Sequence, residues 1–317
     1  MNKNSNALPT IDILLATYNG EQFLDDQIQS ILNQTYPYWR LIIRDDGSTD
    51  NTNAIIHSYA VKYPDKIFII KSSERTMGAC ENFNILLEHV ISDYVMFCDQ
   101  DDVWLPQKIE RTFQKICDME KIYGRNMPLL VYTDLKVADA NLHIITNSYW
   151  RYEAINPNIG KSFSRLLTTN VMTGCTIMIN RKLKEMATPI PQEAMMHDWW
   201  IGLVSSAFGK NDYLNEATIL HRLHTSNVVG AKRYKRTKIF DELIRLFRLK
   251  RIYRHNILRT QPQAAEFASR YKSFLNDNDY KKITIYSKLS DQSFYKRLAI
   301  IRHGFWKSGL PRWFAML

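Results

Sequence analysis

The stretch Tyr94-Val-Met-Phe-Cys-Asp-Gln-Asp-Asp-Val-Trp-Leu-Pro106 joins a short apolar run to three carboxylates. Its first five residues are apolar or aromatic and too few for a globular helix, which predicts a strand buried on both faces of a parallel sheet. Asp99, Asp101 and Asp102 then fall at the carboxyl end of that strand, where open α/β sheets bind ligands. Clustered carboxylates repel one another unless a cation joins them, and hard divalent ions link carboxylates to phosphates. The stretch therefore predicts a metal-diphosphate site, with an acidic turn capping a helix near Pro106 as the alternative.

Strands and helices alternate before this stretch. The short connections predict a parallel, doubly wound sheet built from βα units. Each strand runs into a polar turn, so these turns meet on one rim, where we expect a nucleotide. The usual glycine-rich dinucleotide and P-loop motifs are absent from the sequence. The expected strands are Ile11–Thr17, Trp39–Arg44 and Lys66–Lys71, and the expected helices lie near 21–33, 50–63 and 78–90.

The second half predicts a different order of elements. A strand at Leu129–Asp134 is followed by two strand pieces around a turn at 139–141, and residues 146–160 read as a loop. A helix is then expected over 161–167, a loop and strand over 168–180, an amphipathic helix over 195–208, and a strand over 217–220.

Length and composition limit the class of protein. A chain of 317 residues favours one large domain with an appendage. No apolar run approaches the roughly 18 residues of a membrane span, and the polar N-terminus does not resemble a secretory signal, so we expect a cytoplasmic protein. The spacing of the cysteines predicts reduced, buried thiols at Cys80, Cys98, Cys117 and Cys175.

Charge divides the chain near Ala231. Residues 232–317 hold 21 Lys+Arg against 6 Asp+Glu, whereas residues 1–231 hold 21 against 26. Basic amphipathic helices at 239–253 and 264–275, with Trp306 and Trp313 beyond them, favour contact with an anionic membrane surface. The alternative is a helical bundle packed on the rest of the protein. No nucleic-acid motif is present in the sequence, so no nucleic-acid partner is expected.

Four motifs together carry a resemblance. Ala16–Asn19, Asp45–Asp50, Gly78–Asn82 and Asp99–Pro106, in this order and spacing, resemble family 2 glycosyltransferases over residues 11 to about 230. The stretches 196–200 and 221–227 further resemble a bacterial branch that includes rhamnosyltransferases.

The resemblance implies an α/β GT-A fold of the Rossmann-like type that handles nucleotide-diphosphate sugars. Residues 1–231 would form the catalytic domain, with a nucleotide half at about 11–128 and an acceptor half at about 129–231. Residues 232–317 would form a basic, mainly helical C-terminal extension. Mg²⁺ or Mn²⁺ is the implied cofactor, and the implied reaction is an inverting sugar transfer.

The resemblance also assigns residues on the donor side. Asp46 matches the carboxylate that accepts from the base, although it could be only a turn and helix cap. Asn82 would lie beside the nucleotide, although a solvated helix face is the alternative. Asp101 is the stronger metal ligand, Asp99 is a metal ligand nearer the ribose or sugar, and Gln100 departs from the commoner residue there. The remaining donor-side matches are Thr17, Tyr18 and Asn19, which begin the nucleotide pocket, and His224, a third metal ligand or phosphate donor.

An inverting transfer needs one base to take a proton from the acceptor hydroxyl. Asp198 resembles that base, and the alternative is an N-cap aspartate beside two core tryptophans. Gly174 is expected to let the backbone approach an acceptor sugar, with a bulge or turn as the alternative. The other expected acceptor-side residues are Trp104, His197, Trp199 and Trp200.

The function expected from this resemblance is transfer of a sugar from a nucleotide-diphosphate donor to a lipid-linked or oligosaccharide acceptor in bacterial cell-surface polysaccharide synthesis. The expected donor is dTDP-L-rhamnose, with a UDP-hexose as the alternative. The expected location is the inner face of the cell membrane, as a peripheral protein, with a homo-oligomer left open. Competing hypotheses are a glycosidase, which would need no nucleotide rim, and a non-catalytic nucleotide-sugar or membrane-surface binding module.

Overall fold

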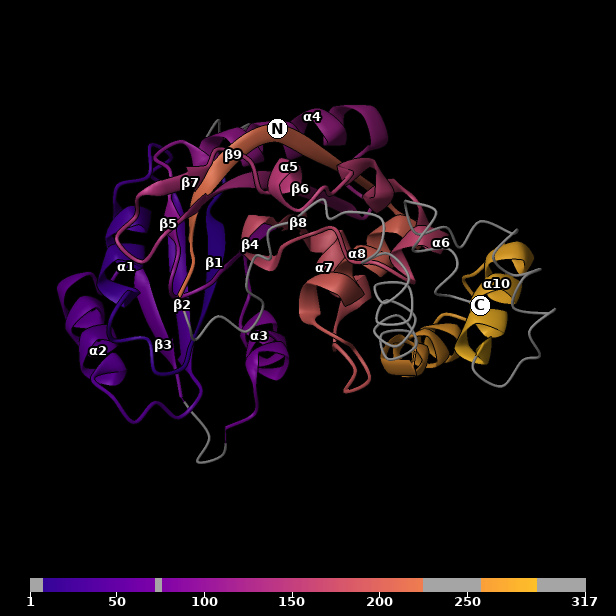
Figure 1. Cartoon of the computed structure of the whole chain (residues 1–317), viewed down its shortest axis with the longest axis horizontal. Coiled ribbons are helices and arrows are strands. Elements are labelled where there is room, and N and C mark those ends of the chain that lie inside the picture. The colour runs from indigo at the N-terminus through magenta and orange to yellow at the C-terminus, as the bar shows by residue number, and fades with distance from the viewer. Residues whose placement is uncertain (1–7, 72–75, 225–257, 290–317) are drawn as a thin grey trace, which may run out of the picture.

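A computed structural model describes residues 8–71, 76–224 and 258–289 (Figure 1). The described strands form one sheet in the order β3-β2-β1-β4-β8-β6-β9-β5, with β7 paired to β6. The strands of the first half are β1 (Ile11–Thr17), β2 (Trp39–Asp45), β3 (Ile67–Ile70) and β4 (Tyr94–Cys98). Those of the second half are β5 (Val103–Trp104), β6 (Leu129–Ala138), β7 (Ile144–Thr146), β8 (Met178–Asn180) and β9 (Lys210–Arg222).

The first four strands are all parallel, as the alternation predicts. All five residues of β4 are buried, and its side chains alternate between two apolar clusters on opposite faces of the sheet. Phe97 joins the cluster with α3, α7 and α8, and Met96 joins the cluster with α1 and α4. A strand covered on both faces favours an unbroken apolar run.

The second half makes the sheet mixed, beyond the βα units of the first half for which a parallel sheet is expected. β8 is antiparallel to both β4 and β6. β9 runs parallel to β6, with register shifts beside Asp134, and then pairs antiparallel with β5. These irregularities let one strand curve across two partners, so that the end of β9 reaches the acidic end of β4.

Helices cover both faces of the sheet, and α3, α7 and α8 lie on the opposite side of β1 from α1 and α2 (Figure 1). The helices are α1 (Leu24–Leu32), α2 (Thr52–Lys62), α3 (Ala79–Glu88), α4 (Lys108–Tyr123), α5 (Tyr149–Tyr152), α6 (Phe163–Leu166), α7 (Arg181–Ala187), α8 (His197–Phe208) and α10 (Asp277–Ser287). Two 3₁₀ segments are η1 (Pro157–Lys161) and η2 (Gly174–Thr176).

Residues 258–289 pack on the part of the chain that precedes them, residues 8–224, instead of standing apart from it. Residues 258–270 are helical, and Phe267 and Tyr271 place their rings against Trp200 of α8, with centroids 5.4 and 6.0 Å away. These side chains belong to the apolar cluster that also covers β4. The packed-bundle alternative therefore holds for this segment. The boundary at Ala231, the helix expected at 239–253, and Trp306 and Trp313 lie outside the described residues.

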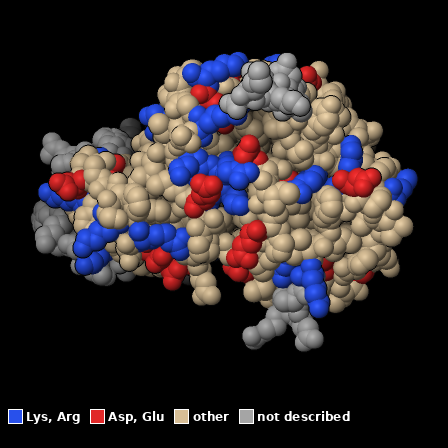
Figure 2. Space-filling view, turned by 180° about the vertical axis from the view of Figure 1, so that it is seen from behind, with Lys and Arg blue, Asp and Glu red and all other residues tan. Residues whose placement is uncertain are grey.

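Figure 2 shows acidic and basic side chains side by side on one face of the molecule. Lys115 and Lys161 both pair with Asp212, and Arg181 pairs with Asp93. Among the described residues, these pairs join basic and acidic side chains that lie far apart in the sequence. In the part of the chain that the structure describes, no helix has both the length and the apolar character to cross a membrane.

Candidate active site

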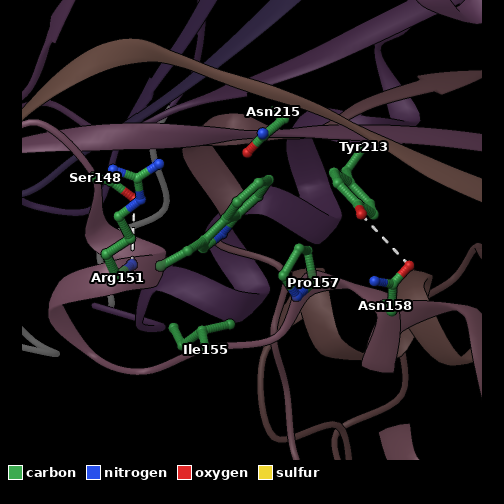
Figure 3. Close-up of a pocket in the computed structure, with 8 residues that line it drawn as sticks. Ser148, Arg151, Ile155, Pro157, Asn158, Tyr213 and Asn215 are labelled. Atoms are coloured by element: carbon green, nitrogen blue, oxygen red, sulfur yellow. Dashed lines mark hydrogen bonds between the residues drawn. The ribbon is translucent and has the colours of Figure 1, made fainter.

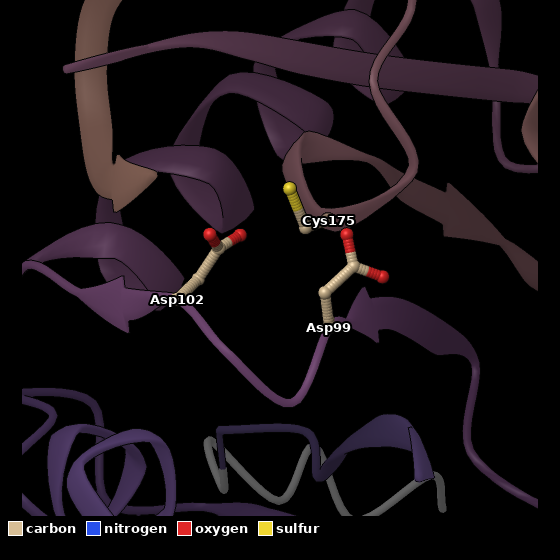
Figure 4. A group of neighbouring side chains, drawn as sticks. All are labelled: Asp99, Asp102 and Cys175. Carbon is tan, nitrogen blue, oxygen red and sulfur yellow. The ribbon is translucent and has the colours of Figure 1, made fainter. Parts of the chain in front are cut away.

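The carboxylates that follow β4 gather at the predicted rim. Ligand atoms of Asp99, Asp102 and Cys175 all lie within 4.8 Å of one another (Figure 4). Asp102 has no exposed surface, and Cys175 comes from η2, which packs against β4. The sequence places Asp102 in the acidic run, but the resemblance leaves it out of the ligand set, and it leaves out Cys175 as well. All four cysteines are free, as expected, but only Cys98 and Cys175 are buried, whereas Cys80 and Cys117 are partly exposed.

Two histidines from the end of β9 meet these carboxylates. His221 Nδ1 lies 2.8 Å from Asp102 Oδ1, and His224 Nε2 lies 2.8 Å from Asp101 Oδ2. Burial alone would lower the pKa of His221, but the neighbouring charge of Asp102 and its hydrogen bond raise the pKa to about 9. The two predicted metal ligands Asp101 and His224 therefore lie in contact. His221 also belongs to this cluster of carboxylates and histidines, although the resemblance does not assign it a role.

The acidic group has the chemistry of a divalent-ion site. Burial, followed by the charges of Asp102 and Asp101, raises the pKa of Asp99. A bound cation would relieve this crowding, and carboxylate oxygens are the ligands that Mg²⁺ and Mn²⁺ prefer. Burial raises the pKa of Cys175 well above its usual value, so its neutral thiol is a poor ligand for a hard ion. The carboxylates and His224 therefore fit the implied ion, and Cys175 does not.

The side chain of Gln100 fastens two turns of the rim. Its Oε1 accepts from the backbone N–H of Tyr18 at 2.8 Å, and its Nε2 donates to the Tyr18 carbonyl at 2.9 Å. A Cβ at Gly20 would lie 2.4 Å from Gln100 Oε1, so a larger residue at position 20 would displace the end of this side chain. These contacts give a structural reason for the unusual middle residue of the motif.

Polar contacts also fix the rest of this turn. Thr17 Oγ1 donates to Asp45 Oδ1 at 2.9 Å. Asn19, at a φ of 47°, receives the N–H of Thr49 on its Oδ1 at 2.8 Å. The Tyr18 side chain is 49% exposed and is open to a ligand. The turn after β1 is thus held rigidly, with one aromatic ring presented outward.

Asp46 and Asn82 are buried and joined through Arg44. The Asp46 carboxylate accepts the N–H groups of Met77 and Gly78 and lies 3.2 Å from Arg44 Nη1. Asn82 accepts from the same Arg44 nitrogen at 3.0 Å and is only 2% exposed. The solvated-face alternative for Asn82 is therefore wrong. Both side chains anchor the start of α3 at the rim, where a nucleotide would lie.

Asp198 lies in the first turn of α8. The N-cap of this helix is Met196, so the alternative that Asp198 is an N-cap residue is wrong. Burial raises the pKa of Asp198 to about 7, while polar contacts with the backbone of Trp199, the side chain of Asn170 and the backbone of Gly174 lower it part of the way. A carboxylate with this pKa can exchange a proton near neutral pH, as a general base must.

Gly174 and Cys175 connect the two carboxylate groups. A Cβ built on Gly174 would lie 2.9 Å from His197 Nε2 and 3.6 Å from Asp198 Oδ2, while the next residue, Cys175, joins the Asp99–Asp102 group. The two groups therefore face the same region from adjacent residues of η2. The close neighbour of Gly174 is the His197 ring, and the residue begins a 3₁₀ turn, in line with the turn alternative. The approach of its backbone to a sugar stays a prediction.

Three of the aromatic residues expected on the acceptor side are buried in the protein. Trp104 and Trp200 are 2% and 0% exposed, so the expectation that they touch an acceptor is wrong. His197 is 4% exposed, its ring centroid lies 4.0 Å from that of Phe83, and burial lowers its pKa to about 3. It therefore supports α8 as a neutral ring. Trp199 stays half-buried, and its Nε1 donates to the Leu166 carbonyl at 2.6 Å.

A pocket of about 330 Å³ opens beside α5 (Figure 3). Asp134 fixes the start of α5 by accepting from the Ser148 hydroxyl at 2.5 Å and from the Tyr149 N–H at 3.1 Å. Tyr149, on the same helix, does not line the pocket, and its ring lies 6.4 Å from that of His221. The sequence reads 146–160 only as a loop and misses this pocket. Its lining is Ser148, Trp150, Arg151, Ile155, Pro157, Asn158, Tyr213 and Asn215.

Comparison with known proteins agrees with this arrangement. The family model described as glycosyl transferase family 2 matches residues 12–186. A dTDP-rhamnosyl transferase, RfbG of Shigella flexneri, is 29% identical over 239 residues, covering 70% of this chain and 77% of that protein. The putative teichuronic acid biosynthesis glycosyltransferase TuaG of Bacillus subtilis (strain 168) is 26% identical over 251 residues, which cover 78% of this chain and 93% of the TuaG chain.

A solved structure shows the same fold. The mannosyltransferase PcManGT from Pyrobaculum calidifontis, in complex with GDP-Man and Mn²⁺, matches with a TM-score of 0.53 at 14% identity, over 94% of this chain and 80% of that one. Because the family model spans more than half of the chain, this chain belongs to glycosyl transferase family 2.

Proposed function

We propose that this glycosyltransferase moves a sugar from a nucleotide-diphosphate donor to an acceptor hydroxyl with inversion. The observation that carries the proposal is that η2 contacts two separate acidic sites, a cluster of carboxylates through Cys175 and a single carboxylate through Gly174. The Asp99–Asp102 group lies at the end of β4, and Asp198, with a pKa of about 7, lies on the other side of Gly174. One group suits a diphosphate with its cation, and the other suits a hydroxyl.

The chain's own residues would divide the reaction as follows. Asp198 takes the proton of the acceptor hydroxyl as its oxygen attacks the anomeric carbon, and the bond from that carbon to the diphosphate breaks on the opposite face. A single displacement of this kind inverts the anomeric carbon. Mg²⁺ or Mn²⁺, held by Asp99, Asp101 and His224 with Asp102 beside them, would supply charge neutralisation for the departing diphosphate. The rim formed by Thr17, Tyr18, Asn19, Asp46, Asn82 and Gln100 would hold the nucleotide.

We assign dTDP-L-rhamnose as the donor, with a UDP-hexose as the alternative. The support is the similarity to RfbG, whose name specifies a dTDP-rhamnosyl transferase. TuaG, whose name refers to teichuronic acid biosynthesis, supports a surface polysaccharide as the product.

The acceptor would be a saccharide or a lipid-linked saccharide that reaches Asp198 past the pocket beside α5. The rings of Trp150 and Tyr213 meet edge to face there with centroids 5.4 Å apart, and Asn158, Asn215 and Arg151 add polar groups. A few polar groups around aromatic rings are typical of small-molecule sites. A lipid-linked acceptor would place the enzyme at the inner face of the cell membrane.

A panel of nucleotide-sugars tests the proposal. UDP-glucose, UDP-GlcNAc, GDP-mannose and dTDP-L-rhamnose would each be added to the full chain with Mn²⁺ or with EDTA, and thermal shift would be followed by measurement of released nucleotide. We expect one nucleotide class to stabilise the protein with Mn²⁺ and to be turned over. A non-catalytic binding module would instead show the shift without turnover, and a glycosidase would show neither.

A further inference from the structure

The region that follows the catalytic half reaches the helix that carries Asp198. Gln263, in the helical residues 258–270, accepts the backbone N–H of Met195 on its Oε1 at 2.8 Å, and its side chain is 1% exposed. Met195 directly precedes Met196, the N-cap of α8, whose carbonyl receives the N–H of Trp200 at 3.1 Å. Asp198 lies within this first turn. The contact therefore acts at the point where the backbone enters the catalytic helix.

Two more contacts hold the other end of the same connection between α7 and α8. Tyr271 donates its hydroxyl proton to the Met186 carbonyl at 2.7 Å, and Arg270 donates to the Pro189 carbonyl. The Arg270 guanidinium also lies 5.2 Å from the centre of the Trp200 ring. Residues 263–271 thus bind the connection near both of its ends and pack on the helix that follows it.

We propose that Gln263 is a positioning residue for Asp198, and that through this one side chain the helix at residues 258–270 supports the active site. The inference rests on the proposed role of Asp198 as the base. A base must lie within hydrogen-bond reach of the hydroxyl whose proton it takes, and a misplacement of 1 Å can cost about 10²-fold in rate. The acceptor for the N–H of Met195 is Gln263, which comes from a segment more than 60 residues away in the sequence.

The chain offers a matched control on the same helix. Gln261 is also buried, and its Nε2 donates to the Tyr286 carbonyl of α10 at 3.2 Å, away from α8. Gln263→Met and Gln261→Met each remove one buried hydrogen bond while keeping side-chain length. A loss that reflects only weaker packing of residues 258–289 would therefore appear in both variants.

The test measures nucleotide release from the donor selected by the panel above, together with hydrogen exchange of the amides of residues 195–199. For Gln263→Met we expect kcat to fall about 10-fold or more with the donor KM within about two-fold of wild type, and these amides to exchange faster. Gln261→Met should keep the wild-type kcat. Gln263→Glu, which keeps an oxygen for Met195 N–H, should restore most of the turnover.

Equal losses in the Gln263 and Gln261 variants, or an unchanged kcat in Gln263→Met, would overturn the inference. If Gln263→Met does not fold, Tyr271→Phe removes the contacts of the Tyr271 hydroxyl with Met186 and Arg270 and should still lower kcat without changing the donor KM. An unchanged kcat there overturns the inference. Asp198→Asn is assayed in parallel. If that variant keeps its turnover, the proposed base is wrong, whereas loss in Asp198→Asn with full activity in Gln263→Met refutes the positioning role alone. If no donor is turned over, the amide exchange rates of residues 195–199 are the test: faster exchange in Gln263→Met than in Gln261→Met supports the inference, and equal rates overturn it.

Discussion

Nε2 of His224 lies 2.8 Å from Oδ2 of Asp101, although 123 positions separate the two residues in the chain. The contact closes the end of β9 over the acidic turn after β4. His221 makes the equivalent contact with Asp102, so each of the two carboxylates has its own histidine. Binding of a cation at Asp101 must compete with or reorganise the first of these contacts.

The first prediction concerns metal dependence. Asp101→Asn keeps the size of the side chain but removes a charge that a divalent ion would bind. Donor affinity should weaken, and most of its dependence on Mg²⁺ or Mn²⁺ should disappear. Calorimetric titration of the donor with and without Mn²⁺ measures both. A metal dependence equal to that of the wild type would show that Asp101 is not a ligand.

The second prediction concerns stability and pH. Burial raises the pKa of Asp198 from its ordinary value of 3.8 to about 7 in the folded protein. The free energy of unfolding therefore includes the full stabilisation from the protonated carboxyl below pH 4, and this stabilisation is lost as the pH rises through 7. Asp198→Asn should therefore raise Tm at pH 8, by about 2–4 °C for each kcal/mol relieved, and change it little at pH 4. Thermal denaturation at both pH values is the measurement. Equal shifts at pH 4 and pH 8 would argue against a raised pKa.

The third prediction uses the close packing of η2 on α8. Gly174→Ala places a methyl group 2.9 Å from His197 Nε2, and this crowding should cost about 1–3 kcal/mol of stability and lower turnover. His197→Ala removes the obstructing ring. In a double-mutant cycle the second change should therefore relieve much of the effect of the first. Additive losses of unfolding free energy in urea would mean that the two residues do not interact.

The fourth prediction concerns the membrane. Residues 258–289 cover Trp200, so a truncation at Ala231 would expose the core of the catalytic half. Truncation after Leu289 spares that packing and removes Trp306, Trp313 and the basic residues around them. The shortened protein should fold and co-sediment less with anionic vesicles than the full chain does, and binding of the full chain should fall as salt rises. Equal binding of the full chain to neutral and anionic vesicles would favour self-association or packing instead.

Local patterns carry the parts of the fold that the sequence predicts well. The buried run of β4 and the carboxylates after it are adjacent in the chain, so both the strand and its rim follow from a few residues. The same holds for β1, β2 and their polar turns. The contacts of His221 and His224 depend on the register shifts beside Asp134, which no short pattern encodes. Cys175 likewise enters the acidic group only through the fold.

Aromatic residues near a motif were harder to assign. Trp104 and Trp200 suit a sugar surface and a core equally well by type, and only their burial separates the two. The first turn of α8 shows the same ambiguity, since an aspartate before an apolar run can be an N-cap or a base. Met196 as the N-cap excludes the first of these roles, and the role of Asp198 as the base stays a proposal. The charge pattern marks residues 232–317 only as basic, so it does not predict that Phe267 and Tyr271 pack on Trp200.

The central claim is that Asp198 is the base of sugar transfer, and one comparison tests it most directly. Asp198→Asn and wild type would be compared for donor affinity and for transfer of radiolabelled sugar to the acceptor. The account predicts donor affinity close to wild type and turnover lower by about 10²-fold or more. Turnover within a few-fold of wild type would contradict it.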